Sequence, residues 1–382
     1  MNKKTGLAIL GVLMVLGIAT VYKIKGNKAL KEQEMADQQL KQEIGQMLMI
    51  GFRGTEASDD SYVAKTIRDL GVGGVILFDI DVPGGRAFPR NITEPEQVRN
   101  LVGELKSFSA TPLLVAVDAE GGMVNRLKEK YGFIPVPSAK ELGDANDAEK
   151  TKEVAKGLSA ELKDLGINVD FAPVVDVNVN PENPVIGSIG RSFSSDPEKV
   201  TQQAEAFLDG LHENGVLSSL KHFPGHGSSA ADSHLGLTDV TSTWSDKEFI
   251  PYERIIKDGK ADMIMTAHIM NMNIDPDYPA TLSSRYIQEI LRDKLGFQGV
   301  VVSDDMQMGA IMENYGFKDA VIRAVNAGCD ILILSNNGKE YSEEMPQEAR
   351  DIIFEAVKSG AIAREKIQKS YGRIMEMKSE TQ

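Results

Sequence analysis

The side chains best suited to chemistry are concentrated in one short segment, residues 221–234, with the sequence KHFPGHGSSAADSH. It contains a lysine, three histidines and an aspartate, and Pro224, Gly225 and Gly227 prevent a regular helix there. Polar side chains held in such a constrained loop are typical of a pocket that transfers protons or binds hydroxyl groups. We therefore expect the functional site in this segment.

A zinc site is one alternative for these histidines. His222 and His226 have the i, i+4 spacing of a helical zinc-binding pair, but Pro224 and Gly225 lie between them and prevent the helix that such a motif needs. We therefore expect neither a metal ion nor an organic cofactor.

Short apolar runs alternate with amphipathic stretches along most of the chain. The apolar runs predict eight strands, at residues 46–52, 73–78, 113–118, 169–176, 217–222, 263–269, 299–304 and 329–335. The amphipathic stretches predict helices at 94–108, 148–165, 197–214, 283–295 and 346–359. This alternation predicts an α/β fold, a (β/α)8 TIM-like barrel that forms a single catalytic domain over residues 46–380.

An open, doubly wound sheet is the alternative fold. Its nucleotide-binding form needs a glycine-rich turn between a strand and a helix, whereas the glycines at 71, 73 and 74 lie before and at the start of a predicted strand.

Polar side chains follow most of the predicted strands. They are Asp79, Asp118, Asp176, Lys221, His222, His268 and Asp304. Barrel enzymes assemble their active sites at the carboxyl ends of the strands, so we expect these residues to converge on one polar pocket. We interpret Asp176, in an Asn- and Pro-rich run, mainly as a residue that orders its own loop. For His268, a core position and a place behind the pocket are both open.

The net charge of −14 over 382 residues excludes a nucleic-acid partner, which would require a basic surface. The one cysteine, Cys329, lies in an apolar run and is predicted to be a buried thiol.

The N-terminus carries an uncharged stretch, residues 5–22, directly after Lys3 and Lys4. As a helix it would be about 27 Å long, close to the hydrocarbon thickness of a membrane. We expect residues 1–28 to be a transmembrane anchor or a cleaved export signal, and the lysines that follow favour the anchor. Residues 29–45 are predicted to form a short stalk. The catalytic domain is then expected outside a bacterial cell membrane, or secreted if the segment is cleaved.

Four motifs carry a resemblance to a known family. KHFPGHG followed by DSH resembles the β-N-acetylglucosaminidases of glycoside hydrolase family 3, and so do the sequences VDAEGG (117–122), GRSF (190–193) and SDDM (303–306), in the same order. The resemblance implies a retaining hydrolase that removes terminal non-reducing β-linked N-acetylglucosamine. It also implies peptidoglycan fragments (muropeptides) as natural substrates. We expect the protein to be a monomer.

The resemblance implies roles for individual residues as well. Asp304 would be the nucleophile, and His234, oriented by Asp232, would be the acid/base. From the residues alone, Asp304 follows a stiff apolar strand that would hold it rigidly, but capping of the following helix explains it equally well. An aspartate that accepts from one imidazole nitrogen would leave the other free to transfer a proton near neutral pH.

The remaining predicted site residues bind the sugar. Asp118 is suited to accept hydrogen bonds from two neighbouring hydroxyls, and the resemblance places Arg126, Arg191, Lys221 and His222 around the terminal sugar. The chain departs from the family at Met123, where an arginine is usual. The details of this loop therefore cannot be carried over from the family, whereas the proposed catalytic pair is unaffected.

Three other functions stay open. Within the family, the chain could be a β-glucosidase or a phosphorylase that uses phosphate in place of water. Outside catalysis, it could be a silent cell-wall-binding module. A single tryptophan argues against an aromatic sugar-binding platform, and the presence of both Asp304 and His234 favours an enzyme.

Overall fold

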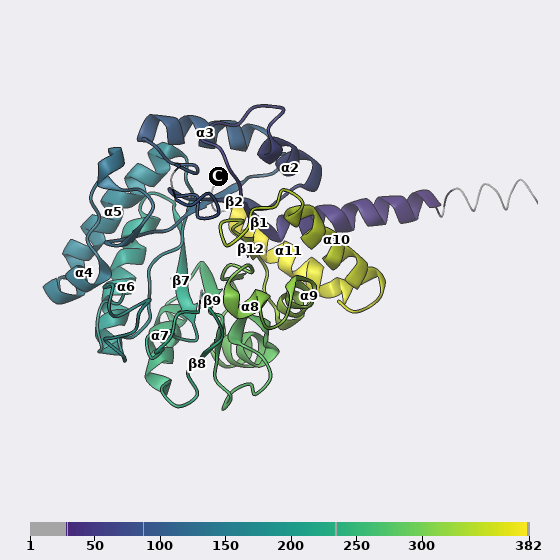
Figure 1. Cartoon of the computed structure of the whole chain (residues 1–382). Coiled ribbons are helices and arrows are strands. Elements are labelled where there is room, and N and C mark those ends of the chain that lie inside the picture. Colours follow the sequence, from purple (N-terminus) through teal and green to yellow (C-terminus); the bar gives the residue numbers. More distant parts are fainter. Residues whose placement is uncertain (1–27, 29, 87, 234, 380–382) are drawn as a thin grey trace, which may run out of the picture. The chain divides into compact units, whose positions relative to one another are not determined.

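The computed structural model describes residues 28, 30–86, 88–233 and 235–379, and the chain divides into two compact units, residues 1–42 and 43–382 (Figure 1). The described part of the predicted stalk, from residue 30, is helical. Nearly all of the predicted anchor lies outside the described residues. Within the described ranges, no helix is both long and apolar enough to cross a membrane.

The second unit is built on one parallel sheet of eight strands whose spatial order follows the chain. These strands are β1 (Leu48–Gly51), β2 (Gly74–Leu77), β3 (Leu114–Val117), β6 (Val169–Asp170), β7 (Leu217–Phe223), β9 (Met263–Thr266), β11 (Val300–Ser303) and β12 (Leu332–Leu334). All eight coincide with predicted strands.

The sheet closes on itself through its last strand. β12 pairs in parallel with β1, with Leu48 opposite Leu332. On its other side, a single parallel bridge joins Ile331 to Val302 of β11. The backbone N–H of Ser303 also donates to the carbonyl oxygen of Ile331 at 2.9 Å. The fold is therefore a nearly closed (β/α)8 barrel, which confirms the predicted fold class.

Helices surround the strands (Figure 1). They are α2 (Tyr62–Leu70), α3 (Pro95–Ser107), α5 (Ala148–Leu165), α6 (Pro197–His212), α7 (Ile250–Lys257), η4 (Arg285–Lys294, with wide π-type turns), α9 (Phe317–Ala327), α10 (Met345–Lys358) and α11 (Arg364–Ser379). Shorter elements lie in the connections: β4 (Ala119–Gly121), β5 (Val124–Asn125), η1 (Glu129–Tyr131), α4 (Ala139–Ala145), β8 (Thr238–Asp239), η2 (Asp246–Phe249), β10 (Ile269–Met270), η3 (Ala280–Leu282) and α8 (Gly309–Met312).

The barrel strands are buried on both faces, which explains why they appear in the sequence as continuous apolar runs. Strand β6 is shorter than the predicted 169–176. Pro173 follows it and has no N–H to donate to a neighbouring strand, so regular pairing stops at Asp170. Cys329 is buried, as predicted, and burial raises the pKa of its thiol.

Three polar residues at the amino ends of the strands tie neighbouring strands together, and we call Asn168, Asp262 and Asp330 the amino-end clamps. The amide of Asn168 accepts from the N–H of Val115 at 2.7 Å. The carboxylate of Asp262 accepts from the N–H of Ser218 at 2.8 Å. Each clamp thus takes a backbone donor that the regular ladder leaves open.

Candidate active site

The opposite, carboxyl end of the barrel holds a cluster of buried and half-buried charged side chains. It consists of Asp118, Glu120, Asp176, Arg191, Lys221 and His222, which we call the carboxyl-end cluster. Strands β3 and β7 and the segments that follow β3 and β6 supply its members. Residues more than 100 positions apart in the sequence therefore meet at one place.

Lys221 lies at the centre of the cluster, with its side chain only 2% exposed. Its Nζ is 2.8 Å from Oδ1 of Asp118 and 2.6 Å from Oε1 of Glu120. Burial alone would lower the pKa of Lys221, but the two carboxylates outweigh it and raise that pKa. Burial would likewise raise the pKa of Asp118, yet Lys221 and Arg126 hold it below its ordinary value. Lys221 and Asp118 therefore stabilise each other in their charged forms.

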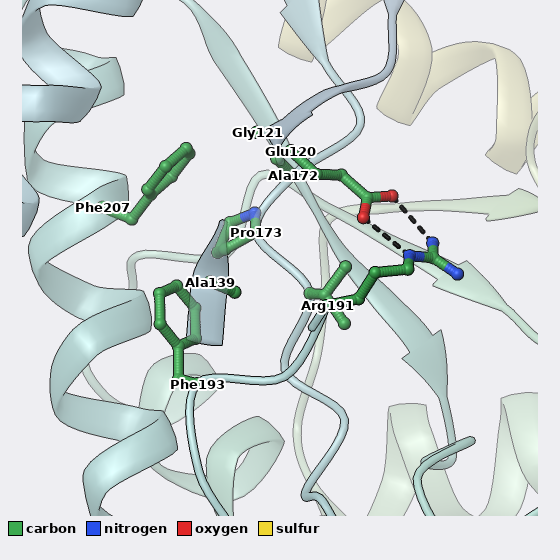
Figure 2. A pocket seen from close by; sticks show the side chains of 9 residues that line it. Glu120, Gly121, Ala139, Ala172, Pro173, Arg191, Phe193 and Phe207 are labelled. Carbon is green, nitrogen blue, oxygen red and sulfur yellow. Dashed lines mark hydrogen bonds and ion pairs between the residues drawn. The ribbon is translucent and has the colours of Figure 1, made fainter. Parts of the chain in front are cut away.

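Glu120 and Arg191 form a bidentate ion pair (Figure 2). Arg191 donates from Nε to Oε2 and from Nη2 to Oε1, both at 2.7 Å. A small cavity borders the pair, with the apolar side chains of Phe193 and Phe207 on its other side (Figure 2). On the far side of the guanidinium, Nη1 of Arg191 donates to the carbonyl oxygen of Val185 at 2.8 Å, so hydrogen bonds keep it in one orientation.

The neighbouring histidine is oriented from both sides. Nη2 of Arg191 lies 3.2 Å from Nε2 of His222, and Nδ1 of His222 lies 2.7 Å from Oδ2 of Asp176. A guanidinium can only donate, so Nε2 accepts and Nδ1 carries the ring proton toward Asp176. The hydrogen-bond network thus fixes the tautomer of His222.

Asp176 corrects the sequence analysis. It does not order its own loop: its side chain is fully buried, and its Oδ1 accepts from the N–H groups of His222 at 3.1 Å and His226 at 2.7 Å. Burial would raise the pKa of Asp176, but His222 and His226 lower it. Its place at the end of a predicted strand was the signal that could have identified it.

The structure brings together all five predicted sugar-binding residues, Asp118, Arg126, Arg191, Lys221 and His222. Arg126 completes the group, with Nη2 at 3.4 Å from Oδ2 of Asp118. Arg126 also lies 3.9 Å from Asp79, which is buried and paired with Lys128. Glu120 was missed by the sequence analysis, although it lies inside the quoted VDAEGG motif.

Asp304 follows β11 at the same end of the barrel. Its backbone N–H donates to the carbonyl oxygen of Thr266 at 3.1 Å, and its Oδ1 accepts from the N–H of Asp305 at 2.7 Å. The side chain of Asp305 turns toward β12, where it accepts from the N–H of Ser335 at 3.1 Å and the hydroxyl at 2.5 Å. His268 is buried beside them, with Nε2 2.9 Å from the carbonyl oxygen of Asp305.

The predicted acid/base lies at the edge of what the structure describes. His234 is outside the described residues, so its geometry with Asp232 stays a prediction. Ser233, between the two, is buried, and its Oγ is 3.0 Å from Nε2 of His226. Burial lowers the pKa of His226 to about 4, which keeps its ring neutral at pH 7.

A second missed residue, Glu248, lies behind this loop. It is fully buried on η2, and its Oε2 accepts from the N–H of Gly227 at 2.9 Å. Burial raises its pKa to about 8. Nothing in the sequence around Glu248 distinguishes it from a surface glutamate. Among the described residues, no group of three or more potential metal ligands gathers.

Known proteins resemble this chain over most of its length. The family model described as glycosyl hydrolase family 3 N terminal domain matches residues 39–377. The chain belongs to glycoside hydrolase family 3. The resemblance noted in the sequence is therefore confirmed.

Several family 3 proteins are similar over most of this chain. A beta-hexosaminidase of Tolumonas auensis is 38% identical over 293 residues, which cover 76% of this chain and 83% of that protein. The structure of a family 3 beta-N-acetylglucosaminidase from Paenibacillus sp. str. FPU-7 has a TM-score of 0.81 and 39% identity, and covers 89% of this chain but 62% of its own. A beta-N-acetylhexosaminidase from Beutenbergia cavernae has a TM-score of 0.79 and 29% identity, over 89% of this chain and 98% of its own.

Proposed function

We propose that this β-N-acetylhexosaminidase removes terminal, non-reducing β-linked N-acetylglucosamine with retention of configuration, and that it acts on fragments of peptidoglycan. The enzyme class follows from family 3 membership and from similarity to beta-hexosaminidases over more than four-fifths of their length. The sugar and the mechanism are the finer parts of the proposal.

The observation that supports it best is the carboxyl-end cluster. Lys221, Arg191 and Arg126 supply fixed donors, while Asp118 and Glu120 supply acceptors, at the end of the barrel where TIM-barrel enzymes bind substrate. A sugar ring offers hydroxyls that both donate and accept. A preorganised set of charged partners can therefore orient it without reorganising during the reaction.

The proposed chemistry proceeds in two steps on opposite sides of the anomeric carbon. Asp304 attacks that carbon, while His234, oriented by Asp232, donates a proton to the leaving oxygen. The same histidine then takes a proton from water, and the water releases the sugar from Asp304. Histidine suits both halves of this cycle because its ordinary pKa lies near neutrality.

We also propose that residues 1–28 tether the enzyme to a bacterial cell membrane with its catalytic domain outside, and that a single copy is active. Both proposals rest on the sequence alone. Fractionation of cells that express the full chain, with accessibility to an added protease, tests the tether.

The first experiment compares initial rates on an aryl β-N-acetylglucosaminide and the matching aryl β-glucoside, for the native chain and for His234→Ala. We expect a strong preference for the N-acetylated sugar, and a loss of about 10²- to 10⁴-fold in the variant on a substrate with a poor leaving group. Equal rates on the two sugars would overturn the proposed substrate. An unaffected variant would overturn the proposed acid/base. A rate that rises with added phosphate, with a sugar phosphate as product, would indicate phosphorolysis instead.

A further inference from the structure

We propose that His226 and Ser233 form a buried clasp that positions the acid/base segment, so that both are positioning residues for proton transfer. This inference rests on the proposed function, because it concerns the placement of Asp232 and His234. Its evidence is the 3.0 Å contact between Nε2 of His226 and Oγ of Ser233. The imidazole belongs to the rigid floor of the site, and the hydroxyl belongs to the loop above it.

The floor side of the clasp is held at several points. The N–H of His226 donates to Asp176 at 2.7 Å, and its carbonyl accepts from Nδ2 of Asn183 at 2.7 Å. The next residue, Gly227, donates its N–H to Glu248 and lies so close to Val177 that a β-carbon would come within 1.7 Å of the carbonyl oxygen. The backbone that carries His226 is therefore held in place, which gives the loop a fixed point of reference.

On the loop side, Ser233 is set apart by its burial. Among the described residues of the stretch 230–237, Ser233 alone is buried, while Ala230, Ala231 and Leu235 are exposed. Ser233 is also the residue directly between Asp232 and His234 in the chain. A hydrogen bond at this point constrains the backbone on both sides of it, and proton transfer is sensitive to displacements of about 1 Å.

The clasp is chemically robust at neutral pH. A neutral imidazole has one donor and one acceptor nitrogen, and a hydroxyl can both donate and accept, so either tautomer of His226 can bond Ser233. Asp176 links the clasp to the sugar pocket, because the same carboxylate accepts from His222 and from His226. One buried carboxylate thus fixes the position of the sugar-binding residues relative to the segment expected to protonate the leaving oxygen.

The test measures kcat/KM on two aryl β-N-acetylglucosaminides, one with a strongly acidic phenol and one with a weakly acidic phenol. This quantity reports the steps up to cleavage of the glycosidic bond, and only the weakly acidic phenol needs a proton in order to leave. For Ser233→Ala we expect about a tenfold loss on the poor leaving group and less than about a twofold loss on the good one. Ser233→Thr, which keeps the hydroxyl, should restore most of the activity.

Ser229→Ala is the matched control. Ser229 is a fully buried serine four residues before Ser233, and its hydroxyl has no hydrogen-bond partner among the residues that the structure describes. It should leave both kcat/KM values unchanged. His226→Leu removes the other half of the clasp at similar volume and should give the same selective loss as Ser233→Ala. Thermal unfolding of every variant identifies any that is unfolded at the assay temperature, and a lower temperature is then used.

His234→Ala, measured in parallel, separates the two levels of the argument. If His234→Ala loses activity selectively on the poor leaving group while Ser233→Ala and His226→Leu lose none, or lose equally on both substrates, the clasp is wrong and the proposed function stands. If His234→Ala lowers kcat/KM equally on both substrates, the proposed acid/base is wrong. The proposal that the clasp positions this acid/base is then wrong as well.

Discussion

Ion pairs occupy both ends of the barrel, but they differ in how much of their surface remains exposed to solvent. At the amino end, Oδ2 of Asp330 accepts from the N–H of Val301 at 2.9 Å and from Arg292 at 2.7 Å, and its Oδ1 accepts from Ser370 and Arg373 at 2.7 and 3.1 Å. At the carboxyl end, the charges pair mainly with one another, side chain to side chain. Asp118 and Arg126 there remain 15% and 31% exposed.

This difference teaches which buried charges to associate with function. Asp330 joins β11 to β12 and has its partners on the chain's own backbone and helices, so it has nothing left to offer a ligand. Asp118 and Arg126 keep part of their surface toward solvent, where a hydroxyl can replace water. Burial of charge does not by itself identify an active site. The residual exposure of Asp118 and Arg126 distinguishes the carboxyl end from the amino end.

The largest expected effect lies at the carboxyl end. Asp304→Asn removes the proposed nucleophile at nearly constant volume, and we expect kcat to fall on the order of 10⁴-fold or more with little change in the unfolding free energy. Steady-state kinetics and chemical denaturation check both halves. A variant with one-tenth of the native activity would show that another group forms the glycosyl bond.

Asp330→Ala at the amino end should have the opposite effect, a loss of stability with little loss of activity. Removing this carboxylate leaves Arg292 buried without its partner, so we expect a loss of about 3–5 kcal/mol in the free energy of unfolding. Folded protein should keep its kcat/KM within a few-fold. Urea denaturation gives the first quantity, and assays well below the unfolding midpoint give the second. A large loss of activity in fully folded variant protein would show that the charges at the amino end also contribute to function.

Arg191→Lys tests whether geometry or charge matters in the carboxyl-end cluster. Lysine keeps the positive charge but cannot make the bidentate contact with Glu120 or the contact with His222. We expect kcat/KM to fall about 100-fold, which is about 2.7 kcal/mol, with a smaller effect on stability. Native-like kinetics would mean that charge alone is sufficient.

Glu248→Gln should have the smallest effect, visible only as a pH dependence. The folded-state pKa of Glu248 is about 8, above the ordinary value of 4.5. The folded state therefore binds the extra proton, and the glutamate costs stability progressively as pH rises from about 4.5 to about 8. Glutamine resembles the protonated acid, so the variant should match the native chain below about pH 4.5 and differ from it only a little at pH 5.

Between pH 5 and pH 7 we expect the stability of the Glu248→Gln variant to rise relative to the native chain by about 2.5 kcal/mol. Denaturation at the two pH values measures this difference. Equal stability of the two proteins at both values would show that Glu248 is ionised in the folded state.

The barrel and part of its site could be predicted because they depend on local patterns. Doubly buried strands appear as continuous apolar runs, and residues such as Asp118, Lys221 and His222 follow those runs directly. Pairings between distant residues left no such pattern. The contact of Glu120 with Arg191 spans 71 positions, and Glu248 is distinguished only by being buried against Gly227.

The closure of the barrel has a consequence for how the protein is made. β12 fits between β1 and β11, and Lys378 near the end of α11 donates from Nζ to Gln46 and to the carbonyl oxygen of Gly73, both at 2.7 Å. Until the ribosome has released these late residues, β1 and β11 each present an unpaired parallel edge. Such edges pair readily with other chains. The nascent polypeptide is therefore exposed to aggregation until β12 has been made, and a chain truncated ahead of residue 332 would keep both edges open permanently.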